Sequence, residues 1–320
     1  MNSKTWWTSG YHKVHAELPR SSVEYDFGTC GDLAVFGATS RGTKHQFRAA
    51  PNQDAFAFCS IESPSKFLVI AVCDGVSQAK FSSYGSRRLA RAAVAQLEKT
   101  IRENKSESTA LDQSVFASVL QAASTAMKAW SVTDLDAPHQ PPEETDYKEL
   151  SSTIALALID ANDADGAGYR VRAAFVGDSP IYLATNDAYT IQTPFTKGGD
   201  LVENSTSALP IKADDLVQPG WIDTRIPAGS HLVIATDGFS NALREGKTKH
   251  ARVLRKLWSS PTGPVALALN VTGIDFDRRG EDDDRSAVIV WAPPFAEVTP
   301  ANDSPTIDRW ATPTSPPIRQ

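Results

Sequence analysis

Two apolar runs that each end in Asp-Gly constrain the fold of this chain more than any other feature. They cover residues 68–75 and 231–238. Short runs of Val and Ile favour buried strands, and glycine lets the chain turn sharply where a strand ends. A third carboxylate cluster, Asp282-Asp283-Asp284, precedes another apolar run at 287–291. Three separated strands with an Asp at one end predict one shared acidic site.

The composition is typical of a soluble protein and excludes several classes of function. The 320 residues are 41% hydrophobic, which is enough for one large domain or two small ones. A formal net charge of −6 argues against a broad nucleic-acid surface. No apolar run approaches the ~18 residues of a membrane-spanning helix, and residues 1–19 lack the apolar segment of a signal peptide. We therefore expect a cytoplasmic monomer with no nucleic-acid partner and no membrane partner.

The predicted elements are short strands and two long helices. The short spacings between the strands at 153–159, 169–176 and 181–184 favour antiparallel hairpins. The other predicted strands cover residues 33–38, 55–59, 66–73, 189–192, 231–236 and 287–291. Apolar stripes at helical spacing predict helices over 84–104 and 112–130, and two shorter helical pieces lie near 247–258 and 263–271. The pattern predicts an α+β fold of antiparallel sheets with helices packed outside.

The remaining segments set the predicted domain boundaries. Residues 1–30 lack clear periodicity and are taken as an N-terminal extension, followed by one domain over 31–292. Residues 293–320 are rich in proline and are expected to form a disordered or loosely docked tail. Residues 40–53 and the acidic stretch 134–149 are predicted loops. The polar stretch 193–224 is a predicted loop long enough to be functional or mobile.

Four carboxylates, Asp54, Asp74, Asp237 and Asp283, flank the predicted strands. Each alone is typical of a turn or a cap, but four like charges brought together raise one another's pKa unless a cation neutralises them. Ligands that are all oxygen select hard cations such as Mg²⁺ or Mn²⁺ over zinc. The chain has no GxxxxGK[ST] phosphate loop, no GxSxG elbow and no dinucleotide-binding glycine motif. Water activated by two close cations is then the expected nucleophile.

Six short motifs follow one another between residues 33 and 291. They are Asn52-Gln53-Asp54, Asp74-Gly75, Ser152-Thr153, Gly177-Asp178-Ser179, Thr236-Asp237-Gly238 and Asp283-Asp284-Arg285-Ser286. In this order and spacing the chain resembles the metal-dependent type 2C protein serine/threonine phosphatases, most closely their bacterial branch. The resemblance implies a four-layer α-β-β-α sandwich, in which helices flank two central antiparallel sheets. It also implies a centre of two Mn²⁺ or Mg²⁺ ions at one end.

The resemblance implies a role for each site residue. Asp74 would bridge both metals, and the carbonyl of Gly75 would be a further ligand. Asp237 and Asp283 would hold the other metal, and Asp54 would contact metal-bound water. The implied activity is hydrolysis of phosphoserine and phosphothreonine on proteins by water activated at the two metals. Such an enzyme acts in signal transduction and opposes a serine/threonine kinase.

Three positions depart from the family pattern. Gln53 stands where the family commonly has a metal-binding Glu; its amide oxygen can still bind metal, but the lost charge predicts a weaker second metal site. Val76 stands where many members have a His proposed as general acid, so the leaving group must take its proton from water or elsewhere. The family's phosphate-binding Arg has no aligned counterpart. Arg48, slightly offset, and His45 are the two candidates for binding phosphate.

Other family features have weaker counterparts here. Asp178, in the Gly-Asp-Ser turn, is expected to be structural, with its side chain accepting hydrogen bonds from nearby backbone N–H groups. The stretch 193–224 occupies the place of the family's variable flap. Asp146 and Glu149 lie near the position of a third-metal ligand, but neither aligns cleanly.

Two alternative functions fit the same residues. A pseudophosphatase would keep the fold and serve as a binding module for a partner protein, with a weakened second metal site. Gln53 and Val76 motivate this alternative, and calorimetry with Mn²⁺ would separate it from the enzyme. A structural Ca²⁺ site around residues 275–284 is a third possibility, although the spacing lacks the EF-hand pattern.

Overall fold

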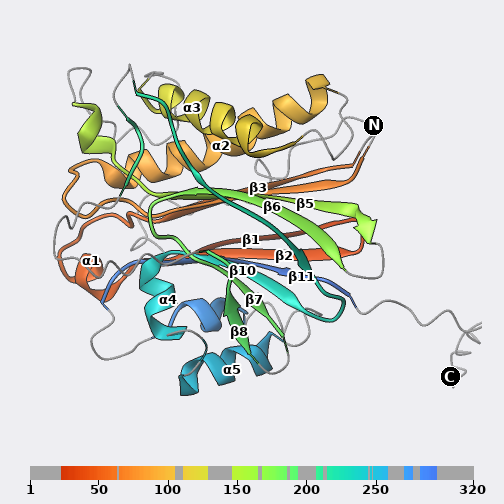
Figure 1. The fold of residues 1–320 in the computed structure, drawn as a ribbon. Helices are drawn as coiled ribbons and strands as arrows, with labels where there is room; N and C mark the ends of the chain where they lie inside the picture. Colours follow the sequence, from red (N-terminus) through yellow and green to blue (C-terminus); the bar gives the residue numbers. More distant parts are fainter. Residues whose placement is uncertain are drawn as a thin grey trace, which may run out of the picture.

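Two antiparallel sheets form the centre of the fold (Figure 1). The computed structural model describes residues 23–62, 65–104, 111–128, 146–164, 168–185, 188–193, 207–211, 215–243, 246, 248–258, 270–276 and 282–293. Sheet A has the order β1-β2-β11-β10-β7-β8, with strands Val23–Cys30, Leu33–Ser40, Arg285–Trp291, His231–Ala235, Ile181–Ala184 and Tyr189–Ile191. Sheet B has the order β3-β4-β5-β6-β9, with strands Ala55–Ile61, Phe67–Cys73, Ile154–Ala164, Tyr169–Val176 and Gly220–Ile226.

Helices cover the outer face of each sheet, so the fold has four layers (Figure 1). α2 (Ser82–Asn104) and α3 (Gln113–Lys128) pack on sheet B, whereas α4 (Asp237–Leu243) and α5 (Lys249–Leu257) pack on sheet A. The predicted stripe of α2 is buried, and its members are Ala90, Val94, Leu97 and Ile101. The predicted α+β sandwich is therefore confirmed.

Burial on both faces explains the unbroken apolar run of β4. Leu68, Ile70 and Val72 point into the core between the two sheets, whereas Val69 and Ala71 point into the core under α2 and α3. Successive strand residues alternate between faces, so a strand that is covered on both sides has no solvated position along its length. The first charged residue can come only where the strand ends.

Strand pairing brings the predicted acidic residues to one end of the sandwich. β10 pairs antiparallel with β11, so the residues that follow β10 lie beside those that precede β11. β3 pairs with β4 in the same way, which places the residue before β3 beside the residue after β4. The approach is close: a Cβ atom on Gly238 would lie 2.0 Å from the backbone oxygen of Asp284. This position therefore requires glycine.

The predicted boundary at residue 30 between the N-terminal extension and the domain lies too late in the chain. β1 pairs with β2 along its whole length, through a turn in which Gly31 has φ +56°. The strand was missed because it lies at the edge of sheet A, where Tyr25 and Phe27 stay largely exposed and the burial pattern is weak. Residues 23–30 thus belong to the sheet.

Three predicted loops contain regular structure. α1 (Thr43–Phe47) interrupts the loop predicted over 40–53. β9 pairs with β6, so the polar stretch predicted to reach residue 224 ends before residue 220. A single 3₁₀ turn, η4 (Tyr147–Leu150), ends the acidic loop. α1 and η4 are only about one turn long, too short to produce a periodic sequence pattern.

Several predictions lie outside the described residues. They are residues 1–22 of the extension, most of the helical piece 263–271, and the proline-rich tail from residue 294. Within the described part of the chain, no helix combines the length and the apolar character needed to cross a membrane.

Candidate metal centre

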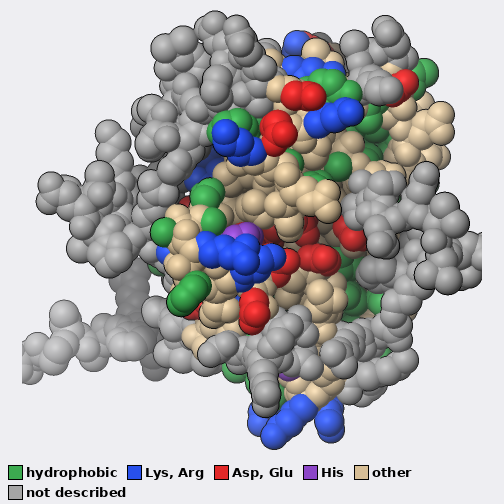
Figure 2. All heavy atoms as spheres, turned by 90° about the vertical axis from the view of Figure 1, so that its left-hand side faces the viewer, with side chains coloured by type: hydrophobic (Ala, Val, Ile, Leu, Met, Phe, Trp, Pro, Cys, Tyr) green, Lys and Arg blue, Asp and Glu red, His purple; other side chains and the backbone are tan. Residues whose placement is uncertain are grey.

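The four predicted carboxylates converge at the end of the sandwich shown in Figure 2, where acidic side chains gather beside a histidine and basic side chains. Asp54 precedes β3, Asp74 follows β4, Asp237 begins α4 after β10, and Asp283 precedes β11. The carboxyl groups of Asp74 and Asp237 lie close enough for each to shift the pKa of the other. Asp237 and Asp283 both lie near enough to Asp54 for their charges to act on it.

The electrostatics of this cluster favour a bound cation. Burial, and then the charge of Asp284, raise the pKa of the Asp54 carboxyl well above its usual range. Burial and the charge of Asp54 do the same to the pKa of Asp74, and burial raises the pKa of Asp237. Carboxylates that are desolvated and repel one another are stabilised by a hard divalent cation, which takes oxygen ligands. The residues present therefore fit Mg²⁺ or Mn²⁺.

A closed ring of buried hydrogen bonds holds Asp54 in place. The Asp54 N–H donates to Asn52 Oδ1 (2.9 Å), and Asn52 Nδ2 donates to Thr39 Oγ1 (2.7 Å). The Ser286 hydroxyl also donates to Thr39 Oγ1 (2.6 Å), and the Ser286 N–H donates to Thr236 Oγ1 (2.9 Å). The Thr236 hydroxyl closes the ring by donating to Asp54 Oδ2 (2.6 Å). The ring joins four chain segments and fixes one carboxylate oxygen of Asp54.

Asp284, which was not among the predicted site residues, is a second hub of hydrogen bonds. The residue is 3% exposed, and its carboxylate accepts from the N–H of Gly42 (2.7 Å) and the N–H of Gln53 (2.6 Å). It also contacts His45 Nδ1 at 2.8 Å. The Asp284 carboxylate therefore links α1 and the segment before β3 to the start of β11. The run of three aspartates marked this region in the sequence, but nothing there distinguished Asp284 from its neighbours.

The Ser152-Thr153 motif holds the backbone of Asp74. The Asp74 carbonyl accepts from the Thr153 N–H (2.8 Å) and from the Ser152 hydroxyl (2.9 Å). The Gly75 N–H donates to the carbonyl of Gln53 at 3.1 Å. Both backbone groups of Gln53 are thus engaged, and its side chain is half-buried. The motif orients the strand end that carries Asp74.

The two candidates for binding phosphate lie in different surroundings. His45 is buried in α1, with Nδ1 directed at Asp284 and at the acidic cluster. Arg48 is exposed at the C-cap of α1, and within the described residues it forms no ion pair. Only His45 therefore faces the carboxylates directly.

The side chain of Asp178 does not have the structural role expected from the sequence. It is exposed and accepts no hydrogen bond from the residues that the structure describes. Its charge raises the pKa of Asp74 and of Asp237, so it lies at the rim of the cluster. The buried member of this turn is Ser179, whose hydroxyl is 2.9 Å from Thr153 Oγ1.

Asp146 and Glu149 both have structural partners. Asp146 caps η4 by accepting from the Lys148 N–H (3.0 Å), and Glu149 Oε2 accepts from the Lys80 N–H (2.7 Å). Each of these carboxylates therefore accepts a hydrogen bond from a backbone N–H group within the protein.

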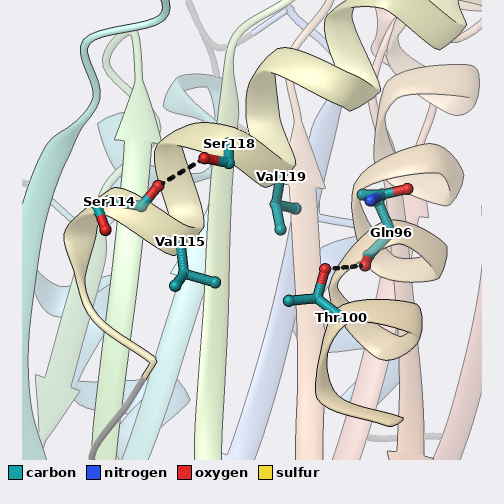
Figure 3. A pocket seen from close by; sticks show the side chains of 6 residues that line it. All are labelled: Gln96, Thr100, Ser114, Val115, Ser118 and Val119. Atoms are coloured by element: carbon teal, nitrogen blue, oxygen red, sulfur yellow. Dashed lines mark hydrogen bonds between the residues drawn. The ribbon is translucent and has the colours of Figure 1, made fainter. Parts of the chain in front are cut away.

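A shallow hollow of about 270 Å³ lies between α2 and α3 (Figure 3), lined by Gln96, Thr100, Ser114, Val115, Ser118 and Val119. The Thr100 hydroxyl donates to the Gln96 carbonyl (2.9 Å), and the Ser118 hydroxyl donates to the Ser114 carbonyl (3.0 Å). These two hydroxyl groups are therefore already engaged within their own helices.

Comparison with solved structures shows a shared fold. A serine/threonine phosphatase of S. agalactiae is 14% identical over 84% of this chain and 99% of its own, with a TM-score of 0.50. The phosphatase domain of SpoIIE from Bacillus subtilis, with a fragment of its regulatory domain, is 14% identical over 86% of this chain and 71% of its own (TM-score 0.48). The serine/threonine phosphatase PstP/Ppp of Mycobacterium tuberculosis is 17% identical over 82% of this chain and 99% of its own (TM-score 0.47).

Sequence comparison places the chain in a family. No curated protein matches this sequence. The family model for protein phosphatase 2C matches residues 41–269, which is more than half of the chain. The resemblance inferred from the six motifs is thereby confirmed, and the chain belongs to the protein phosphatase 2C family of protein serine/threonine phosphatases.

Proposed function

We propose that this protein hydrolyses phosphoserine and phosphothreonine on cytoplasmic proteins, with two divalent cations as cofactors, and so opposes a serine/threonine kinase. The observation that carries the proposal is the convergence of Asp54, Asp74, Asp237 and Asp283, whose arrangement fits hard cations. Membership of the phosphatase 2C family supports the same chemistry. A pure binding module is not favoured, because the cluster of carboxylates weakens the fold unless a cation occupies it.

Each residue has a proposed part in this reaction. Asp74, Asp237, Asp283 and the Gly75 carbonyl would hold Mn²⁺ or Mg²⁺, and Asp54 would hold water at the centre. When bound, such cations supply Lewis-acid activation of water and neutralise charge on the phosphate oxygens.

The surrounding residues fix this geometry before substrate arrives. The Thr236 hydroxyl holds one oxygen of Asp54 and leaves the other oxygen available to the centre. The Asp284 carboxylate holds α1 and the segment before β3 against β11. Preorganised groups of this kind lower the cost of reaching the transition state. The side chain of Val76 has no ionisable group, so the leaving group takes its proton from water or from another residue.

The test is metal-dependent hydrolysis of para-nitrophenyl phosphate and of a phosphothreonine peptide. Asp74→Asn and Asp237→Asn keep the side-chain volume but remove charge, and we expect both to abolish hydrolysis with Mn²⁺ or Mg²⁺. Asp282→Asn removes the charge of an exposed aspartate next to Asp283 and is the matched control. Full turnover by Asp74→Asn would refute the proposal, provided that circular dichroism shows a folded protein.

A second variant tests the weakened metal site. Gln53→Glu restores a negative charge beside the cluster, so we expect a higher rate at low Mn²⁺ and little change at saturating Mn²⁺. An unchanged Mn²⁺ dependence would show that Gln53 does not limit metal binding.

A further inference from the structure

The short helix α1 is fixed against the acidic centre by one face. His45, on that face, is 6% exposed, and its Nδ1 contacts Asp284 at 2.8 Å. The N–H of Lys44 donates to the backbone oxygen of Asp282 at 3.1 Å. Gly42, just before the helix, donates its N–H to Asp284 as well. α1 is therefore held beside the carboxylates rather than projecting freely from the surface.

A neighbouring face of α1 carries two cations and a phenylalanine. Lys44, Phe47 and Arg48 are related by three and four positions, so they share one side of the helix, next to the side that carries His45. Phe47 is 94% exposed, and both cations are exposed. Figure 2 shows basic side chains beside the histidine and the acidic cluster. We call these three residues the α1 face.

Nothing in the described part of the fold accounts for the α1 face. Phe47 is 94% exposed, so its ring buries almost no apolar surface and adds almost nothing to the stability of the fold. Within the described residues, neither Lys44 nor Arg48 forms an ion pair. An exposed aromatic ring with cations beside it is typical of a site that binds another molecule.

The charge of the acidic centre indicates which kind of molecule the α1 face binds. A phosphorylated protein must bring a dianion to a cluster of carboxylates, and nearby cations reduce that repulsion and attract the substrate. An aromatic side chain gains binding energy by covering an apolar residue of the same substrate. Charge complementarity and the exposed ring of Phe47 therefore match a phosphorylated polypeptide segment.

We infer that the α1 face binds the substrate segment next to the phosphorylated residue, and that Phe47 selects segments with an apolar side chain there. The inference rests on the proposed function, because it needs the phosphoryl group at the acidic centre. It adds a determinant of substrate preference that lies on the protein surface, outside the carboxylate cluster.

The test is a set of phosphothreonine peptides with an otherwise polar sequence, in which one leucine is moved through the four positions on either side of the phosphothreonine. We expect wild type with Mn²⁺ to hydrolyse one or two of these peptides with a higher kcat/KM than the all-polar peptide. Phe47→Ala should lower that preference about tenfold, equivalent to about 1.4 kcal/mol. The matched control is Val253→Ala, which trims another exposed apolar residue, 47% exposed, on α5.

Each outcome decides a different question. Loss of the preference in Phe47→Ala but not in Val253→Ala supports the inference. A wild type that shows no preference for any leucine position, or a Phe47→Ala variant that keeps it, overturns the inference and leaves the proposed function standing. A wild type that hydrolyses neither the peptides nor para-nitrophenyl phosphate refutes the proposed function and the inference together.

Discussion

His231 should make the fold sensitive to acid. It lies in β10, 5% exposed, with its ring 6.1 Å from the ring of Tyr189 and 6.3 Å from that of Trp258. Its Nε2 has no hydrogen-bond partner among the residues that the structure describes. Burial in these apolar surroundings lowers the pKa of His231 from 6.5 to about 4. The residue to change is therefore His231, and His231→Phe removes the titrating group while keeping an aromatic ring.

The size of the effect follows from the two pKa values. Because the folded pKa is lower than the unfolded one, the unfolded chain binds the proton more readily below pH 6.5. The stability contributed by neutral His231 is complete above pH 6.5 and is lost as the pH falls towards 4. Linkage gives a loss of about 2 kcal/mol between pH 7.5 and pH 5. For a domain of this size that is a fall in Tm of about 4–8 °C.

The measurement is urea unfolding of wild type and His231→Phe from pH 7.5 to pH 5, with a chelator present. Carboxylates of the centre titrate in both proteins, so their contribution cancels in the difference between the two. The unfolding free energy of wild type should fall by about 2 kcal/mol relative to the variant over this range. A difference that stays constant with pH would show that native His231 is solvated or already charged, and would refute the reasoning.

Three other substitutions test the site and the packing. Burial raises the pKa of the Asp54 carboxyl, so its ionised form destabilises the metal-free fold. At pH 7.5, Asp54→Asn should therefore raise the Tm of the metal-free protein and abolish the Tm gain with Mn²⁺; a lower Tm would contradict this. Thr236→Val breaks the bonds to Asp54 and Ser286 and should cost about 2–3 kcal/mol in urea unfolding, whereas Thr236→Ser should cost less. Gly85→Ala places a Cβ 1.9 Å from the Leu150 oxygen, so its Tm should fall by several degrees; an unchanged Tm would mean that η4 moves freely.

The strands and the acidic end of the sandwich were predictable because both follow from local pattern. β4 and β10 are apolar on both faces, and a charge can appear only where such a strand ends, so Asp74 and Asp237 were visible in the sequence. β1 and β9 were missed because edge strands expose one face and lose the apolar pattern.

The supporting hydrogen bonds could not be predicted from local pattern. Ser286 and Thr39 are 247 positions apart, and their contact depends on the register of β11 against β2. Asp284 sits between a predicted metal ligand and a strand, and its partners Gly42 and His45 are about 240 positions away. A sequence shows which residue types are present, but tertiary register decides which of them meet.

The strand order of sheet A has a consequence for the order of synthesis. β2 leaves the ribosome early, but its partner β11 ends at residue 291, and β11 is the strand that joins β1 and β2 to β10, β7 and β8. Sheet B is complete once residue 226 has emerged. The nascent chain can therefore pair one whole sheet while the other remains in two separate pieces. Asp283 is among the last described residues to arrive, so an unfinished chain cannot assemble the full carboxylate cluster.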